Sequence, residues 1–432
     1  MKGPDFEVRT PDWLSPSEAL QRILSQSGRL EPEVVSLQDA VGRALSENQF
    51  ARATLPPWDN SAMDGYAVVA SDLAGATPST PRALLVTRAI YAGDPPGDPI
   101  APGEAVRIMT GAPIPPGADS VVRVEDTDAE TNTGTVQVLS DRDATRNIRP
   151  AGEDMQLGDL VLQAGESVSA GTVAALASLG LDAVSVVRRP TVSILATGDE
   201  LRTANRYDEV RAGAGVPESN GPMLAAAARG ASAVPLRTEI VPDDPDLLRA
   251  RIEAAADADV LVTIGGASMG EADLVKRVLD QVGFRQDFWR VRMRPGSPFG
   301  FGWLPREGRD QAVFSLPGNP VSAFVTFDLF VRPYLLTLGG HKRVLRRTIQ
   351  CRAGERLSGP AALTYFSRVT LDDSTVPATA RLAGPQGSGL VRSLSSAEGF
   401  AIIPEAQKEV VAGDLVDVML IDATPGAVAF GG

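Results

Sequence analysis

Cysteine and histidine are almost missing from this chain of 432 residues, which has one of each. With Cys351 alone, the sequence excludes an internal disulfide and any zinc or iron–sulfur site built from several cysteines, as suits a reducing cytosol. A Ser-His-Asp triad or a histidine metal centre would depend on His341, which lies in a Gly-Gly-His-Lys connector. Any chemistry is therefore expected to rest on other side chains.

Positive charge is also scarce, because 41 Lys and Arg residues stand against 54 Asp and Glu, a net charge of −13. This balance disfavours broad binding to DNA or RNA, so an anionic ligand would need a local basic patch. The N-terminus lacks the apolar segment of a secretory signal, and the longest apolar-looking stretch, 167–187, contains Asp182 and many small residues. We expect no nucleic-acid partner, no membrane segment and a cytoplasmic protein.

Hydrophobic patterning divides the chain into regions of different fold class. Short β-type runs between Pro- and Gly-rich turns predict a β-domain at 54–144, inserted into a composite N-terminal domain made of 1–53 and 145–188. Strands that alternate with helices predict an α/β domain with a largely parallel sheet at 189–340. Short alternating strands predict a C-terminal β-barrel or sandwich at 345–432.

Three segments of the α/β region, 193–201, 263–273 and 314–322, are expected to join a strand to a helix. Ligands of open parallel sheets bind beyond the carboxyl ends of the strands. Glycines such as Gly265, Gly266 and Gly270 allow close backbone approach, and the N–H groups of a helix start favour oxyanions. Each loop alone is also explained by helix capping, but three loops at one sheet edge favour a ligand site.

Two further segments carry polar side chains with alternative interpretations. Arg290, Arg292 and Arg294 alternate with apolar residues, so on a strand they share a face that either binds phosphate or a tetrahedral oxyanion or is simply solvated. The segment 56–66 could hold Mg²⁺ or a metal oxyanion, or could form an Asx-turn with a hairpin tip at its Asp-Gly pair.

Two adjacent acids of the α/β region, Asp243 and Asp244, are expected to have different roles. Asp244 is expected to cap a helix that starts at Pro245. Asp243 is left without such a role and is the better candidate for a functional site.

Four motifs occur in order along the chain: 59–68 (DNSAMDGYAV), 107–113 (RIMTGAP), 197–201 (TGDEL) and 317–322 (PGNPVS). Together they resemble the molybdopterin molybdenumtransferases, the family of MoeA and the gephyrin E-domain. The similarity extends through 149–154, 265–273 and 386–389 and covers nearly the whole chain.

The resemblance implies a homodimer with its active site between subunits and four parts in each chain: the composite N-terminal region, the inserted β-domain, a molybdopterin-binding α/β domain and a C-terminal β-barrel. It implies a Mg²⁺-dependent transferase that takes adenylylated molybdopterin and molybdate, inserts molybdenum and releases AMP. Implied partners are an upstream molybdopterin adenylyltransferase and downstream molybdoenzyme apoproteins or chaperones. The alternative is a divergent paralogue that binds molybdopterin or its adenylate, or uses tungstate, without efficient molybdate insertion.

The resemblance also assigns residues. The catalytic set is Asp64, Thr110, Glu200, Asp243 and Asp273; Glu200, Asp243 and Asp273 would handle Mg²⁺ or the adenylate phosphate, and Asp64 and Thr110 would reach across the dimer. The cofactor-binding set is Gly198, Asp199, Gly265, Gly266, Ser268, Arg290, Arg294, Ser297, Pro317, Gly318, Asn319 and Ser388.

Two departures from the family pattern bear on the activity. Where the family usually reads Lys-Pro-Gly-Lys-Pro, this chain has Arg294 and Ser297, and Arg290 replaces an earlier lysine. Because a guanidinium fork differs from a mobile ammonium, these changes bear directly on molybdate binding. The segment 213–220 lacks the usual tyrosine and aspartate before its Ser-Asn pair, and a flexible loop is expected there.

Overall fold

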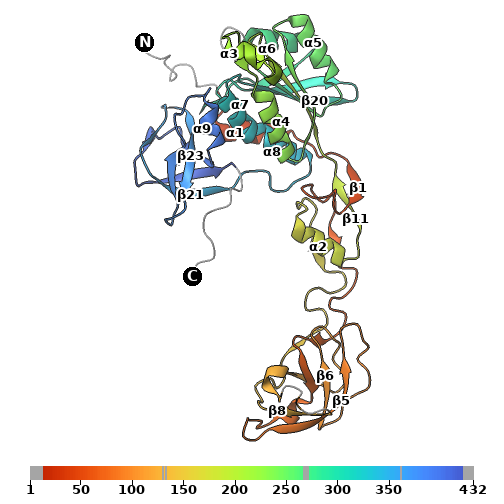
Figure 1. Ribbon diagram of the computed structural model, residues 1–432. Helices are drawn as coiled ribbons and strands as arrows, with labels where there is room; N and C mark the ends of the chain where they lie inside the picture. The colour runs from red at the N-terminus through yellow and green to blue at the C-terminus, as the bar shows by residue number, and fades with distance from the viewer. Residues whose placement is uncertain (1–12, 129–130, 132–133, 266–271, 361, 422–432) are drawn as a thin grey trace. The chain divides into compact units, whose positions relative to one another are not determined.

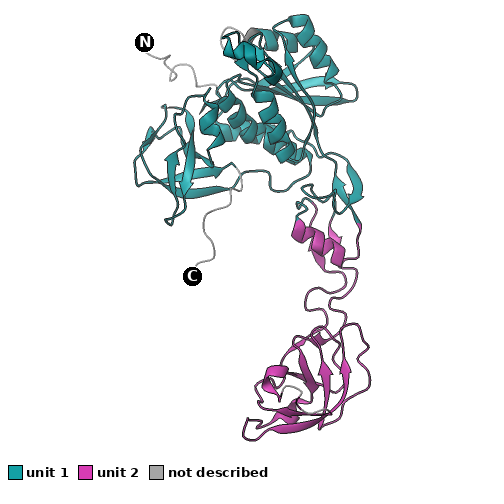
Figure 2. Ribbon diagram, viewed as in Figure 1, with its two compact units in different colours: residues 1–47, 165–169, 183–432 teal, residues 48–164, 170–182 magenta. Residues whose placement is uncertain are grey.

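The computed structural model describes residues 13–128, 131, 134–265, 272–360 and 362–421. Contacts divide the chain into two compact units, which Figure 2 colours separately. The first unit comprises residues 1–47, 165–169 and 183–432, and the second unit comprises residues 48–164 and 170–182. The chain therefore leaves the first unit and returns to it twice.

A six-stranded sheet forms the centre of the first unit (Figure 1). Its order is β15-β12-β16-β20-β19-β17, and the first four strands are parallel to their neighbours, whereas β19 and β17 are antiparallel. The prediction of an α/β region with a largely parallel sheet is confirmed. The strands are β12 (Thr191–Thr197), β15 (Val234–Val241), β16 (Val260–Ile264), β17 (Arg285–Phe288), β19 (Gly300–Arg306) and β20 (Arg309–Leu316).

Both faces of this sheet are covered, because successive side chains of a strand point to opposite sides. On β12, Ile194 belongs to a core shared with Leu224 of α4 (Asn220–Gly230), whereas Leu195 belongs to a second core shared with Leu248 of α5 (Pro245–Ala254). The helix α6 (Ala272–Gln281) packs on the second face with α5. The carboxyl ends of the parallel strands are thus held rigidly between two helical layers.

The helices of the first core include a continuous stretch of 19 residues made of α7 (Pro320–Thr326), the π-helix η5 (Phe327–Val331) and α8 (Arg332–Leu338). Among the described residues, this is the one helical stretch that is long and apolar enough to cross a membrane by length and composition. Within the structure it is 78% buried. It is therefore accounted for as a core helix that packs on the sheet.

The last part of the first unit is a closed five-stranded β-barrel. The strands follow the order β23-β24-β21-β27-β25, and β25 pairs back with β23. Of the predicted alternatives, the barrel is correct and the sandwich is wrong. The barrel strands are β21 (Thr348–Ala353), β23 (Thr364–Asp372), β24 (Thr379–Leu382), β25 (Gly399–Ile403) and β27 (Leu415–Leu420).

The second unit is built on a five-stranded sheet of order β7-β4-β6-β5-β8. Gly65 begins β4, the strand between β7 and β6, and a Cβ at this position would lie 1.9 Å from the Val122 carbonyl oxygen of β7, so only glycine allows this pairing. The hairpin-tip alternative for the Asp-Gly pair is wrong, because the preceding strand β3 pairs with β9 and not with β4. The sheet strands are β4 (Gly65–Val68), β5 (Arg82–Ile90), β6 (Glu104–Ile108), β7 (Ser120–Arg123) and β8 (Thr135–Val138).

Shorter elements complete both units. Those of the first unit are α1 (Pro16–Ser25), β1 (Pro32–Ser36), β11 (Ala183–Val187), β13 (Leu201–Arg202), η4 (Ala204–Arg206), α3 (Tyr207–Arg211), β14 (Val216–Pro217), β18 (Met293–Arg294), β22 (Leu357–Ser358), α9 (Val391–Ser395) and β26 (Glu409–Val410). Those of the second unit are β2 (Gln49–Phe50), β3 (Asn60–Ser61), η2 (Ala70–Leu73), η3 (Val124–Asp126), β9 (Ile148–Arg149), β10 (Leu160–Leu162) and α2 (Ala170–Ser178).

Candidate active site

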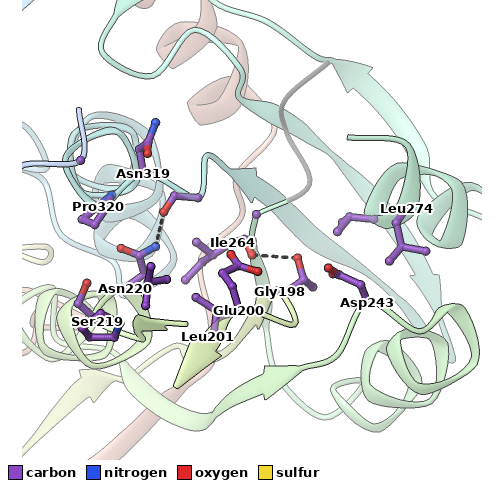
Figure 3. Close-up of a pocket in the computed structure, with 18 of the residues that line it drawn as sticks. Gly198, Glu200, Leu201, Ser219, Asn220, Asp243, Ile264, Leu274, Asn319 and Pro320 are labelled. Atoms are coloured by element: carbon purple, nitrogen blue, oxygen red, sulfur yellow. Dashed lines mark hydrogen bonds between the residues drawn. The ribbon is translucent and has the colours of Figure 1, made fainter. Parts of the chain in front are cut away.

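A cavity of about 1030 Å³ lies at the carboxyl ends of β12, β16 and β20 in the first unit (Figure 3). The three loops singled out in the sequence meet there, as expected for a parallel sheet. They contribute Gly198 and Glu200, Gly265, and Gly318 with Asn319. The other lining residues are Ala196, Thr197, Leu201, Val216, Pro217, Ser219, Asn220, Asp243, Pro245, Ile264, Leu274, Val275, Arg277, Pro320, Gly389 and Val391.

Two glycines set how closely these loops approach. Gly265 has a φ of +100°, and a Cβ there would lie 2.7 Å from Oγ1 of Thr197. Gly198 has a φ of +149°, and its Cβ would lie 2.6 Å from a carboxylate oxygen of Glu200. A side chain at either position would be strained and would displace the neighbouring loop. The glycines therefore place the Glu200 carboxylate against the backbone of its own loop, on the cavity wall.

Asp199 and Asp243 join the first loop to the end of β15. The backbone N–H of Asp243 donates to Oδ1 of Asp199 at 3.1 Å, and the N–H of Asp199 donates to Oδ2 of Asp243 at 3.4 Å. Asp244 caps α5 by accepting from the N–H groups of Asp246 and Leu247. The predicted helix cap at Asp244 is confirmed, and Asp243 lines the cavity, where its role stays a prediction.

The Asp243 carboxyl has an unfavourable electrostatic environment. Burial raises its pKa above the usual value, and the nearby charges of Asp199 and Glu200 raise it further, against the opposing hydrogen bond from the Asp199 backbone. A raised pKa caused by burial and like charges in a cavity is typical of a functional site, because structural acids are normally compensated. The acids at this end of the cavity therefore concentrate negative charge that favours a cation, and Arg277 also lines the cavity.

The donor set fits a Mg²⁺ ion that is shared with a substrate. Among the described residues, no group of three or more His, Cys, Asp or Glu side chains is arranged to hold a metal. Mg²⁺ usually takes one or two carboxylates together with substrate phosphates and waters rather than an all-protein cage. Glu200 and Asp243 supply two such carboxylates. Asp273 lies in the first turn of α6, and its side chain is not described; Gly266 and Ser268 lie outside the described residues.

The C-terminal region of the first unit closes one side of the cavity. The side-chain amide of Asn319 donates to Oγ of Ser388 at 3.1 Å, and the Val321 N–H donates to the Ser388 carbonyl at 3.0 Å. Asn319 is the N-cap residue of α7, but its side chain makes no capping hydrogen bond. Its side chain therefore tethers the 386–389 loop, in place of the capping role considered from the sequence.

A fully buried arginine holds the same loop. Arg368 has no exposed surface, and its guanidinium donates to the carbonyl oxygens of Pro385 and Gly387 and to Oγ of Ser393. Burial lowers its pKa. This residue was not predicted, because an arginine inside a β-strand gives no sign of which distant loop it will reach.

The predicted arginine stripe is wrong as a continuous strand. Only Met293–Arg294 forms a strand here. Arg290 stacks on the Trp13 ring, Arg292 pairs with Glu405 at 2.9 Å, and Arg294 is exposed. Aromatic stacking and an ion pair thus turn neighbouring guanidinium groups in different directions. Like Ser297, whose hydroxyl donates to the Met293 carbonyl, these arginines do not line the described cavity.

The remaining two predicted catalytic residues lie together in the second unit. Both the N–H and the hydroxyl of Thr110 donate to Oδ1 of Asp64 at 2.7 Å. These hydrogen bonds hold the pKa of Asp64 below its usual value. A second cavity of about 610 Å³ lies in this unit, with Asn60, Gly111 and Arg149 in its wall.

Comparison with known proteins covers most of the chain. Family models match the MoeA N-terminal region (domains I and II) at 14–180, a probable molybdopterin-binding domain at 193–337 and the MoeA C-terminal region (domain IV) at 350–421. A molybdopterin molybdenumtransferase 2 of Mycobacterium tuberculosis is 37% identical over 405 residues, 92% of this chain and 97% of that protein. The chain belongs to the MoeA family.

Other members of the MoeA family agree with this assignment. The molybdopterin molybdenumtransferase of Bacillus subtilis is 35% identical over 425 residues, 98% of this chain and 97% of its own length. A crystal structure of the molybdopterin biosynthesis MoeA protein from Pyrococcus horikoshii superposes with a TM-score of 0.81 at 27% identity, and covers 94% of this chain and all of that one. The multidomain fold is thus that of the MoeA family.

Two cavity residues of this MoeA family member were not predicted. The side-chain amide of Asn220, at the start of α4, donates to the Gly318 carbonyl at 2.6 Å and so joins α4 to the third loop. Arg277 lies on α6 and brings a positive charge to the cavity wall. No motif of the sequence pointed to it, because a single arginine within an amphipathic helix is usually solvated.

Proposed function

We propose that this chain is a molybdopterin molybdenumtransferase of molybdenum cofactor biosynthesis, which inserts molybdenum from molybdate into adenylylated molybdopterin and releases AMP. The main support is the convergence of three glycine-containing loops with Glu200 and Asp243 at one sheet edge. Loops of this kind accept phosphate, and the adjacent carboxylates suit the cation that accompanies it. A cavity of about 1030 Å³ is large enough for a pterin nucleotide.

The residues of the chain have distinct tasks in this proposal. Glu200 and Asp243, together with Asp273, hold Mg²⁺, which when bound neutralises phosphate charge during cleavage of the adenylate. Gly198, Gly265 and Gly318 keep the loops close to the ligand, and Pro317 sets the turn that precedes Gly318. Asn319 and Ser388 orient the ligand from the side of the cavity that faces the β-barrel. Arg290, Arg294 and Ser297, which were predicted as molybdate contacts, do not line this cavity, so the proposal leaves molybdate to the residues that do.

The assembly belongs to the same proposal. We propose a cytoplasmic homodimer in which Asp64 and Thr110 of one chain complete the site of the other, with four domains in each chain divided as the sequence predicts. A molybdopterin adenylyltransferase would supply the substrate, and molybdoenzyme apoproteins or chaperones would receive the product. The short hydrogen bonds from Thr110 keep Asp64 ionised, which suits a residue that must face a bound cation or cationic group.

The direct test is AMP release by the purified protein with adenylylated molybdopterin, Mg²⁺ and low-micromolar molybdate, coupled to reconstitution of a molybdenum-free apoenzyme. Molybdate-dependent AMP release with active cofactor is expected. Tight pterin binding without release would contradict the proposal and would favour the divergent paralogue. Asp246→Asn is a matched control for Asp243→Asn, because Asp246 is an exposed acid in the first turn of α5 and does not line the cavity.

A further inference from the structure

The residues 198–200, which include Glu200 of the cavity wall, form the acid loop. An insert of 13 residues, 203–215, follows it and connects β13 to β14. The insert contains η4 and α3, and its two ends are joined by pairing of β13 with β14. A flexible loop was predicted for 213–220, which begins after α3 and includes β14. The Val216 N–H donates to the Glu200 carbonyl at 2.8 Å. The base of the insert is therefore part of the backbone frame that carries Glu200.

Arg202 connects the insert to this frame through its guanidinium. One terminal nitrogen donates to the carbonyl oxygens of Asp199 at 2.6 Å and Leu201 at 2.9 Å, while Nε donates to a Glu209 carboxylate oxygen on α3 at 2.8 Å. The Arg202 side chain is only 17% exposed. Gly215 has a φ of +131°, and a Cβ there would lie 2.9 Å from Cγ of Arg202, so the turn leaves room for this side chain.

The contacts of Arg202 complete a chain of restraints around the acid loop. Asp199 is held through its carbonyl by Arg202, and through its N–H and carboxylate by Asp243. Glu200, which lines the cavity, is the next residue. A guanidinium can hold a carbonyl and a carboxylate at once with fixed geometry, which a lysine ammonium does less well.

Glu209 in turn anchors Arg202. Its carboxylate also accepts from Arg206, and these hydrogen bonds hold its pKa below the usual value. Arg206 reaches the same carboxylate from η4, and the described hydrogen bonds of its guanidinium go to Glu209 and not to Asp199 or Leu201. Arg202 and Arg206 therefore share Glu209 as a partner, but Arg202 also donates to the Asp199 carbonyl of the acid loop.

We propose that Arg202 is a positioning residue, which fixes the backbone of the acid loop so that Glu200 and Asp243 face the bound phosphate and its cation, and that α3 serves as its anchor. This inference rests on the proposed function. On this proposal, the insert helps to fix the geometry of the site and is more than a connection at the surface. Arg202 does not line the cavity and acts through the loop that does.

The kinetic test compares Arg202→Met with Arg206→Met. Loss of Arg202 is expected to lower kcat for AMP release about tenfold with little change in KM, because a small misplacement of the acids slows the reaction more than it weakens binding. Arg206→Met keeps the contact with Asp199 and is expected to retain kcat. Glu209→Gln should lower kcat about threefold, because its amide oxygen still accepts a hydrogen bond without the charge.

Hydrogen exchange provides a readout that does not depend on activity. In Arg202→Met, the Asp199 and Leu201 amides are expected to exchange about tenfold faster, because the loop opens more often, whereas Arg206→Met should leave them unchanged. Equal effects of both substitutions would overturn the proposal, since the insert would then act only through its own stability. Unchanged exchange and kcat in Arg202→Met would also overturn it. If the wild type releases no AMP, the proposed function fails and exchange alone decides on Arg202.

Discussion

The two acidic sites of this chain have opposite electrostatics. In the first unit, burial and two neighbouring acids raise the pKa of Asp243. In the second unit, two hydrogen bonds from Thr110 lower the pKa of Asp64, and both Asp64 and Asp243 are exposed by surface area, so their neighbours make the difference. In the first site, the ionised form of Asp243 is disfavoured and would be stabilised by a bound cation. In the second site, the ionised form of Asp64 is already stabilised by hydrogen bonds. The difference indicates that Asp243 serves ligand binding and lowers the stability of the folded chain. Asp64, by contrast, has its hydrogen-bonding partner, Thr110, within the second unit.

The largest effect is expected from removing the charge of the first site. Asp243→Asn should lower AMP release about a hundredfold or more, in the range found when a preorganised charge is removed from an active site. Its thermal midpoint should stay equal or rise, because the like charges of Asp199 and Glu200 lose a repulsive neighbour. Steady-state kinetics and calorimetry measure the two quantities. A folded Asp243→Asn variant with full turnover would remove this residue from the mechanism.

The next largest effect is expected on folding stability, from a substitution of Asp259, an acid that lies outside the cavity. Asp259 accepts two hydrogen bonds from Arg188 at 2.7 and 2.8 Å and two from Thr191, and these outweigh burial and lower its pKa. Asp259→Asn should cost about 2 to 3 kcal/mol of folding stability, below the full value for a buried pair because Arg188 is partly exposed. Denaturation at neutral pH tests this. If Asp259→Asn left stability unchanged, or if the folded variant lost activity, Asp259 would not be the structural acid that this comparison with Asp243 requires.

A smaller effect with a distinct pH dependence is expected for Asp64. Because its pKa is lower in the folded state, its ionised form stabilises the second unit at neutral pH, and this contribution is lost as the pH falls through the folded pKa, below the usual value of about 3.9. The thermal midpoint of Asp64→Asn should therefore lie below that of the wild type at pH 7 and approach it in acid. A difference that grows in acid would reverse the assignment.

The smallest effect is expected from restoring the family lysines. Arg294 is exposed and Ser297 is bound to the Met293 carbonyl, and neither lines the cavity. The double variant Arg294→Lys with Ser297→Lys should change the KM for molybdate within about threefold, as substitutions outside a site do. A large gain in insertion would instead show that this chain lost a molybdate contact and would favour the divergent paralogue.

Local chemistry explains what could be predicted from the sequence. The capping box of Ser15 and Glu18 starts α1 at Pro16, and Asp244 starts α5 at Pro245, because these signals act within four residues. The buried run Val260–Ile264 followed by Gly265 indicates a central parallel strand and a close turn. The cavity loops could therefore be named in advance.

Contacts between distant segments explain what could not be predicted. The bond from Asn319 to Ser388 joins residues 69 apart, and Arg292 turns toward Glu405 although its spacing is that of a strand face. Arg202 was not singled out, because its role depends on where α3 folds back. Such contacts depend on tertiary packing, which overrides the local pattern.

The most direct test of the account is mixing two inactive variants, Asp64→Ala and Asp243→Asn, refolded together to form mixed dimers. If each site combines Asp64 of one chain with Asp243 of the other, one of the two sites in a mixed dimer is intact, and random mixing should restore about a quarter of wild-type AMP release. If both residues act within one chain, each site keeps one defect. The account predicts recovery, and no recovery from mixed dimers of confirmed composition would contradict it.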